Sequence, residues 1–291
     1  MSEMTQLRTG KGARDENFPV ASWLIRKRHR PIILAFYEFV RIADDIADHP
    51  KLGSTEKLAL LDRLESSLLG HGDEPAGRRL LALLNARNLS PRHAQDLLNA
   101  FRQDVTKLRY VNWDELIDYC SRSAMPVGRF VLDVHGEAHD TWPASDALCA
   151  ALQIINHLQD CQADYLNLDR VYIPLDALAA ENIGVEELAA ARSSPALENC
   201  LHGLAVRTAS MLQKSERLPA MVSDRWLAME ISIIQSLASR LLGILQRRDP
   251  LCDRVHLNKS QVLATAILGS TRSLLRLPFR TVPSPRTYQT S

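Results

Sequence analysis

Five side chains between Tyr37 and Asp48 have types and a spacing suited to binding a metal ion. Tyr37, Arg41, Asp44, Asp45 and Asp48 follow one another at i, i+4, i+7, i+8 and i+11, which puts all five on one face of an α-helix. The residues between them are mostly apolar, so this acidic face must border core-facing surface. Carboxylates placed in this way repel one another and are costly to bury without a compensating charge.

A second segment repeats the pattern. Asn156, Asp160 and Asp164 are spaced four residues apart within an apolar run, so they share a helix face. Mg²⁺ would neutralise such groups, because it takes one or two carboxylates and fills its octahedron with water and phosphate oxygens. Two of these faces opposed across a cavity predict a small Mg²⁺ cluster bridged by a diphosphate. The residues alone leave open that each is a solvated surface stripe, whereas a calcium loop is not expected without a DxDxDG motif.

The elements that must hold these residues are helices. Strand and hairpin signals are nearly absent, so we expect an all-α, bundle-like fold of about nine or ten helices. Asn112 with Glu115 resembles a capping box, Pro126 predicts a break, and Ser145 is expected to cap a helix. Residues 165–174 are expected to form a loop. The predicted helices cover 17–28, 31–48, 55–69, 91–107, 113–139, 145–164, 185–192, 196–218, 224–247 and 260–276.

Composition limits the class of protein. We expect one helical domain over 17–276, a flexible N-terminus at 1–16 and a mobile tail at 277–291. A net charge of +1 argues against a nucleic-acid partner. Five cysteines without a CxxC pair indicate reduced thiols and a cytoplasmic location. No signal peptide is expected, and the apolar runs look too short to span a bilayer. The basic cluster at 26–30 leaves peripheral contact with anionic lipid open.

At these residues the chain resembles the squalene/phytoene synthase family, over about 17–276. The matching segments are ENFPVASWLIRKRHRP (16–31), YEFVRIADDIAD (37–48), YCSRSAMPVGR (119–129), NHLQDCQAD (156–164) and RVYIP (170–174). The resemblance implies an isoprenoid-synthase-like helical bundle with a central cavity. Within the family, the first, third and fourth segments look most like the hydroxysqualene synthase branch of hopanoid biosynthesis.

The resemblance also implies roles for individual residues. Asp44, Asp48, Asp160 and Asp164 would bind Mg²⁺ and act in catalysis, with Asn156 beside them and Asp45 either a ligand or a supporting residue. Arg41 would contact diphosphate, although a salt bridge that orients Asp44 or Asp45 is the alternative. Arg170 and Tyr172 would close the diphosphate end, or else only pack the loop. The other expected substrate contacts are Phe18, Ser22, Tyr37 and Met125.

Two departures from the family pattern bear on the reaction. Squalene and phytoene synthases carry a tyrosine where this chain has Ser121-Arg122, and they use it to join two prenyl diphosphates. Gln159 stands where much of the family has arginine. The resemblance therefore implies a Mg²⁺-dependent carbon–oxygen lyase that ionises presqualene diphosphate and adds water to give hydroxysqualene and diphosphate. NADPH is not expected, since no GxGxxG motif follows a strand.

Two other functions stay open from the sequence. One is a prenyltransferase that condenses two prenyl diphosphates to a squalene or phytoene-type product. The other is a non-enzymatic relative that binds lipid or supports assembly, for which eroded aspartates would be expected; all five are intact. The leading interpretation implies functional coupling to a presqualene diphosphate synthase and a hydroxysqualene reductase.

Overall fold

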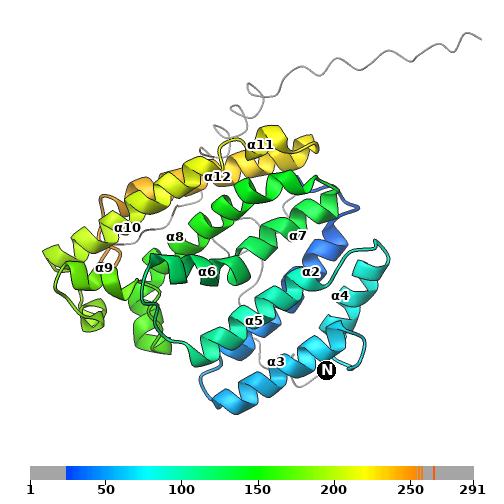
Figure 1. The fold of residues 1–291 in the computed structure, drawn as a ribbon, viewed down its shortest axis with the longest axis horizontal. Helices are drawn as coiled ribbons and strands as arrows, with labels where there is room; N and C mark the ends of the chain where they lie inside the picture. The colour runs from blue at the N-terminus through cyan, green and yellow to red at the C-terminus, as the bar shows by residue number, and fades with distance from the viewer. Residues whose placement is uncertain (1–23, 254, 256, 258–264, 266–291) are drawn as a thin grey trace, which may run out of the picture.

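The computed structural model describes residues 24–253, 255, 257 and 265. Within this part of the chain the regular structure is helical (Figure 1), and the only β-type pairing is an isolated bridge between Arg109 and Val171. The all-α prediction is confirmed. The helices are α2 (Arg30–Ala47), α3 (Ser54–Leu68), α4 (Pro75–Asn85), α5 (Arg92–Thr106), α6 (Trp113–Ser123), α7 (Met125–His135), η1 (His139–Thr141), α8 (Trp142–Leu168), α9 (Leu175–Ala180), η2 (Val185–Ala189), α10 (Pro195–Lys214), α11 (Leu218–Met221) and α12 (Arg225–Leu245).

The clearest local signals are confirmed. α2 begins one residue before Pro31, which occupies its first turn where a missing N–H costs nothing. The side chain of Asn112 accepts a 2.9 Å hydrogen bond from the Glu115 backbone N–H and so caps α6. The break predicted at Pro126 separates α6 from α7 at Ala124. The first feature sets the start of α2, which carries the first acidic face, and the other two set the bounds of α6 and the start of α7.

Other boundary predictions are wrong. Ser145 does not cap α8, because Pro143 starts that helix at Trp142 and leaves Ser145 buried inside it. α8 also continues through 165–168, which was expected to be loop, and it ends at Asp169 with φ 50°. Residues 24–28 form turns rather than the end of a helix, and α4, α9 and α11 were not predicted. The helix expected at 260–276 and the termini expected at 1–16 and 277–291 lie outside the continuously described residues.

Two hydrophobic cores hold the helices together. One is built mainly on α2, α3, α4 and α5, around Phe39, Leu61 and Leu64. The other is built mainly on α6, α8, α10 and α12. In Figure 1 these two groups lie on opposite sides of the molecule, and α7 runs between them. α7 belongs to both cores, since Phe130 packs in the first and Leu132 in the second.

α12 corrects one expectation about membranes. Among the described residues it is the one helix long and apolar enough to cross a bilayer by length and composition, with a mean hydropathy of 1.4, whereas the sequence suggested no such segment. Half of that apolar window (50%) is buried inside the molecule. α12 packs against α8, α10 and α11, which is the environment of a core helix.

Candidate active site

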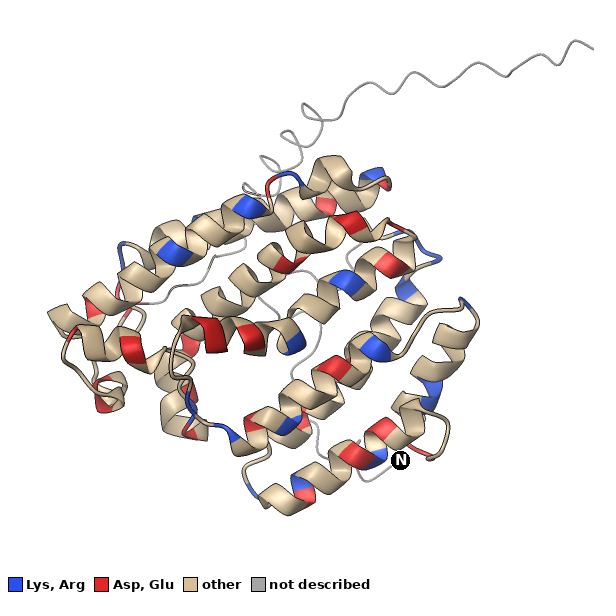
Figure 2. Cartoon of the chain, viewed as in Figure 1, with Lys and Arg blue, Asp and Glu red and all other residues tan. Residues whose placement is uncertain are grey.

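The acidic faces of α2 and α8 line one cavity of about 420 Å³. We call this cavity the carboxylate chamber. The structure brings together there the four aspartates that the sequence singled out, and α5 adds a fifth acidic side chain. The acidic residues that line it are Asp44, Asp48, Asp104, Asp160 and Asp164. Elsewhere acidic and basic positions are interspersed along the helices (Figure 2), so this clustering is a local feature.

Arg41 organises the α2 side of the chamber. Its guanidinium donates to the Asp44 carboxylate at 2.8 Å and to the Asp45 carboxylate at 2.9 Å. Asp45 is only 3% exposed and is absent from the described chamber lining. The alternative weighed from the sequence, a salt bridge that orients these carboxylates, is therefore present. Tyr37, one turn earlier on the same face, lines the chamber as well.

Asp164 and Asn156 on α8 share the chamber with an aromatic stack. The Nδ1 atom of His157 lies 4.0 Å from the Asp164 carboxylate, and its ring stacks on Tyr172 with centroids 3.7 Å apart. Burial lowers the pKa of His157 to about 3. His157 is therefore a neutral wall residue at physiological pH, and it supplies no positive charge to the chamber.

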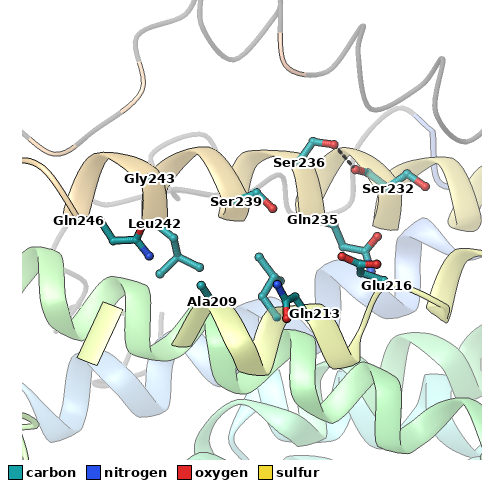
Figure 3. A pocket seen from close by; sticks show the side chains of 11 residues that line it. Ala209, Gln213, Glu216, Ser232, Gln235, Ser236, Ser239, Leu242, Gly243 and Gln246 are labelled. Atoms are coloured by element: carbon teal, nitrogen blue, oxygen red, sulfur yellow. Dashed lines mark hydrogen bonds between the residues drawn. The ribbon is translucent and has the colours of Figure 1, made fainter. Parts of the chain in front are cut away.

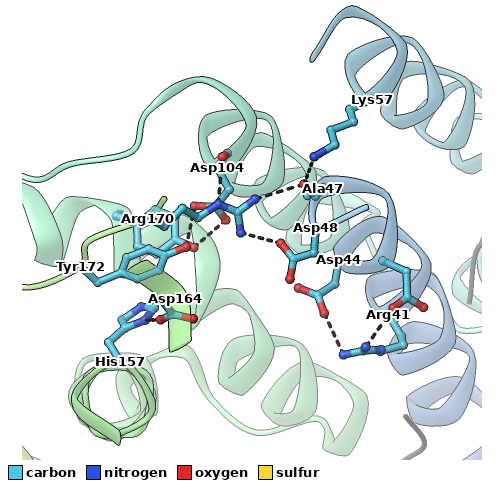
Figure 4. A network of polar contacts seen from close by, with 12 residues as sticks. Arg41, Asp44, Ala47, Asp48, Lys57, Asp104, His157, Asp164, Arg170 and Tyr172 are labelled. Carbon is cyan, nitrogen blue, oxygen red and sulfur yellow. Dashed lines mark hydrogen bonds and ion pairs between the residues drawn. The ribbon is translucent and has the colours of Figure 1, made fainter. Parts of the chain in front are cut away.

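Arg170 ties the separate helices together (Figure 4). Its guanidinium donates to the Asp48 carboxylate, to the Ala47 backbone oxygen at 3.1 Å and to the Asp104 backbone oxygen at 3.1 Å. Lys57 also donates to the Ala47 oxygen, at 2.8 Å, so two cations meet the negative end of α2. Arg170 follows the left-handed residue that ends α8. It therefore links the ends of α2, α5 and α8.

Asp104 is a site residue that the sequence reasoning missed. Its carboxylate accepts hydrogen bonds from the Tyr119 hydroxyl at 2.7 Å and the Tyr172 hydroxyl at 3.0 Å, and the residue is 4% exposed. It lies seven residues after Leu97 and four after Ala100, both buried on α5. A carboxylate on the apolar stripe of a helix is the signal that would have identified it.

Burial and the crowding of carboxylates raise the pKa values of three aspartates. Burial raises the pKa of Asp44 from 3.8 to about 7, and the charge of Asp48 is the second cause of this shift. Burial also raises the pKa of Asp164 from 3.8 to about 7, and the charge of Asp160 is the second cause. Burial likewise raises the pKa of Asp104 to about 6, although Arg170 and two tyrosines oppose the shift. The chamber holds more negative charge than its own cations balance.

The donor set fits Mg²⁺. Its oxygens come from carboxylates and one amide, which are the hard ligands that Mg²⁺ prefers. Among the described residues no three His, Cys, Asp or Glu side chains converge closely enough to hold a metal by themselves. Mg²⁺ is ordinarily bound by one or two carboxylates together with water and phosphate, so facing pairs of aspartates suit it. Asp44 and Asp48 would serve from α2, and Asn156, Asp160 and Asp164 from α8.

A second cavity, of about 320 Å³, adjoins the first. We call it the apolar chamber. Tyr37, Val40, Val127 and Asn156 line both cavities. The remaining apolar walls come mainly from α2, α7, α8 and α12, with Ile25 and Leu218 beside them. The two chambers thus place a charged compartment beside an apolar one.

Gly128 sets how closely α7 and α8 approach in the apolar wall. A Cβ atom there would lie 2.4 Å from the Ser145 hydroxyl and 2.6 Å from the Cys149 sulfur. A side chain at position 128 would therefore force the Ser145 and Cys149 side chains to shift. The Ser145 and Cys149 side chains thus fill the space that glycine leaves between α7 and α8.

The other residues expected to bind substrate fall in different places. Tyr37, Arg170 and Tyr172 line the carboxylate chamber. Met125 is half-buried and packs against the hydrophobic core, and it is absent from the described lining of both chambers. Phe18 and Ser22 lie outside the described residues.

A further hollow of about 270 Å³ lies between α10 and α12 (Figure 3). Serine and glutamine side chains provide most of its polar surface, and Glu216 is the acidic residue in its described lining. Such a lining has neither paired carboxylates nor a cationic cluster. Among the described residues this hollow therefore offers no counterpart to the paired carboxylates of the carboxylate chamber.

Comparisons with known proteins agree with this geometry. The family model described as squalene/phytoene synthase matches residues 12–261. Hydroxysqualene synthase from Rhodopseudomonas palustris is 55% identical, covering 96% of each chain. Hydroxysqualene synthase from Sinorhizobium fredii is 54% identical, covering 91% of each chain. The crystal structure of a squalene synthase from Alicyclobacillus acidocaldarius superposes with a TM-score of 0.72 at 30% identity, covering 84% of this chain and 92% of that one. The chain therefore belongs to the squalene/phytoene synthase family, whose members act on prenyl diphosphates with a divalent metal.

Proposed function

We propose that the protein is a hydroxysqualene synthase: it ionises presqualene diphosphate, lets the resulting cation rearrange, and adds water. The observation that carries the proposal is the junction of a carboxylate chamber and an apolar chamber through shared wall residues. A diphosphate head and two long hydrocarbon chains need those two environments side by side. The two relatives named above, which match over more than nine-tenths of the chain, carry this activity in their names.

The position of each residue in the two chambers indicates its role in the proposed reaction. Asp44, Asp48, Asp160 and Asp164 would hold Mg²⁺, which supplies positive charge to the leaving diphosphate as its C–O bond breaks. Arg41 and Arg170 hold the carboxylates of α2 in place and add positive charge beside them. The bonding electrons leave with the diphosphate, and the cation remains against apolar walls that shield it from bulk water. The net change, C–O cleavage followed by water capture, fits the lyase class better than the transferase class.

The end of α6 supports the absence of the condensation step. Where related synthases have a tyrosine, the Ser121 hydroxyl donates to the Asp118 backbone oxygen at 2.6 Å. The Arg122 guanidinium binds the Asp118 carboxylate and the Gln103 side chain. Both side chains are thus engaged with their own neighbourhood. Neither offers a phenol for the joining of two prenyl diphosphates.

Product analysis tests the proposal. Presqualene diphosphate with Mg²⁺ should yield hydroxysqualene and diphosphate by mass spectrometry, and added NADPH should not change the product. Farnesyl diphosphate alone should give no presqualene diphosphate. Its formation would favour the prenyltransferase alternative. A reduced hydrocarbon that depends on NADPH would contradict the assignment.

A peripheral membrane contact near the apolar chamber belongs to the same proposal. Arg26, Lys27 and Arg28 are exposed, and Arg26 pairs with Asp224 at 2.9 Å just before α12. Trp226 is 46% exposed beside this basic turn. Basic and indole side chains together suit an anionic lipid surface. The enzyme would work in the cytoplasm against that surface, between an enzyme that makes presqualene diphosphate and one that reduces hydroxysqualene.

A further inference from the structure

We propose that Glu230 of α12 is a catalytic residue that holds the attacking water and accepts its proton. This inference rests on the proposed function. Glu230 is 4% exposed and lines the apolar chamber rather than the carboxylate chamber. None of the aspartates needed for the diphosphate is involved in this role.

The surroundings of Glu230 are unusual for a carboxylate. Its neighbours Leu227, Ile231 and Ile234 line the same chamber, so it sits on the apolar face of its helix. It is the one acidic side chain among the described residues that form this lining. A carboxylate is costly to bury in such a wall, and a buried carboxyl group in a cavity is a candidate for acid–base chemistry.

The aspartates of the other chamber are poorly suited to this role. Asp44 is bound by Arg41 and Asp48 by Arg170, and Asp104 accepts from two tyrosine hydroxyls. They also surround the place where the diphosphate would bind. Glu230 lies on the side of the cavity system where the hydrocarbon cation remains after the diphosphate has left.

The start of α12 is firmly held, which fixes where Glu230 lies. Asp224 caps the helix by accepting from the backbone N–H groups of Trp226 at 2.9 Å and Leu227 at 3.3 Å. Glu137 accepts from the backbone N–H groups of Ser223 at 2.7 Å and Asp224 at 2.8 Å. A general base works best from such a fixed position.

The proposed water addition conserves atoms and electrons. The water oxygen donates an electron pair to the cationic carbon and forms the new C–O bond. One water proton passes to the Glu230 carboxylate, and the other stays as the alcohol hydrogen. The diphosphate has already departed with the electrons of the broken C–O bond. Glu230 later releases its proton to solvent, so that no oxidant or reductant is needed.

Glu230→Gln tests the assignment by separating two readouts, the rate of diphosphate release and the fraction of product that is alcohol. The amide keeps the shape of the side chain but cannot accept the proton. We expect diphosphate release within about threefold of wild type and an alcohol fraction lowered by about a hundredfold, the lower end of the range for general-base catalysis. The missing alcohol should appear as hydrocarbons formed by proton loss from the cation. Glu230→Asp should recover part of the alcohol, and Glu216→Gln, at an exposed position, should match wild type.

The outcomes separate cleanly. An unchanged alcohol fraction in folded Glu230→Gln would overturn the inference, and so would an equal fall in both readouts, which would mean that Glu230 supports ionisation or folding. If circular dichroism shows that Glu230→Gln is unfolded, Glu230→Asp decides: a wild-type alcohol fraction there, with the carboxylate moved by one methylene, would reject the role. Failure of the wild type to make alcohol from presqualene diphosphate would instead reject the proposed function.

Discussion

The two chambers share wall residues, yet their linings have opposite character. The carboxylate chamber has five acidic side chains, whereas the apolar chamber has Glu230 alone among its described lining residues. α2 contributes to both: Tyr37 lies at the junction, and Asp44 and Asp48 follow two and three turns later on the same face. A single helix face can thus change from an apolar wall to a carboxylate wall over about 16 Å at 1.5 Å per residue.

This difference teaches that the two halves of the substrate can be bound almost independently. Most of the charge lies at one end, where arginines and a bound metal can balance it. The other end stays low in polarity, so that a cation there is exposed to few competing nucleophiles. Each chamber should therefore respond to its own mutations and leave the other largely intact.

The largest effect should come from removing charge in the carboxylate chamber. Asp44→Asn, or Asp160→Asn, should lower kcat by roughly 10²–10³-fold, the scale for losing one preorganised electrostatic group. Single-turnover release of diphosphate measures it. Asp62→Asn on the exposed side of α3 is the matched control. Unchanged turnover after Asp44→Ala combined with Asp160→Ala would show that the acidic faces are merely structural.

The same chamber should control how stability depends on pH in the metal-free protein. The pKa values of Asp44 and Asp164 are raised from 3.8 to about 7, so the folded state keeps protons that the unfolded state has released. These two groups therefore lower stability as pH rises from 3.8 through 7. Magnesium with diphosphate should restore it, most strongly above pH 7.

Thermal unfolding with EDTA checks this prediction. His157, with its pKa lowered from 6.5 to about 3, acts in the opposite sense below pH 6.5, so the comparison should be made between wild type and Asp44→Asn. The variant should gain Tm relative to wild type as pH rises. A difference in Tm that does not vary with pH would contradict the crowding of charge described above.

Filling the apolar chamber should have a smaller effect of another kind. Leu152→Trp adds volume to its wall and should raise KM for presqualene diphosphate by about tenfold, the worth of some 1.4 kcal/mol of lost binding. The gain in Tm from magnesium and inorganic diphosphate should be unchanged. Leu166→Trp, on the same helix but 59% exposed, serves as control. Loss of the magnesium effect in Leu152→Trp would show that the chambers are not separable.

The smallest effect is expected at the basic turn. Lys27→Ala should weaken binding to phosphatidylserine-containing vesicles by about fivefold, since each basic residue near such a surface contributes about 1 kcal/mol. Turnover of detergent-solubilised substrate should not change. Lys51→Ala, an exposed lysine elsewhere, should bind vesicles as wild type does in co-sedimentation. Equal loss in both variants would indicate only a general effect of charge.

The sequence predicted most accurately those residues whose positions follow the helical period. The facing positions Asp44, Asp48, Asp160 and Asp164 follow from the helical period, which local sequence determines, and the structure does bring them to one cavity. Asp104 could not be paired with Tyr119 and Tyr172 in advance, because the contact joins three elements distant in sequence. The start of α8 was misjudged because Pro143 outcompetes Ser145 as a start signal.

α4 was missed for a different reason. It is eleven residues long, and its leucines stand in one short run at 80–84, so it offers too few turns for a helical period to be recognised. It is held instead by close packing: a Cβ atom at Gly77 would lie 2.8 Å from the Leu68 backbone nitrogen of α3. Tertiary contact of this kind leaves no local pattern in the chain.

The existence of two hydrophobic cores, with α7 contributing to both, has a consequence for how a bulky substrate enters. A pocket cut into a single core would have to break that core to widen. Here the apolar chamber lies between helices of the two cores, α2 in the first and α8 and α12 in the second, so widening it does not require either core to lose its own packing. The guanidinium of Arg170 joins the ends of α2, α5 and α8. It would therefore hold together two groups of helices that are each rigid by their own packing.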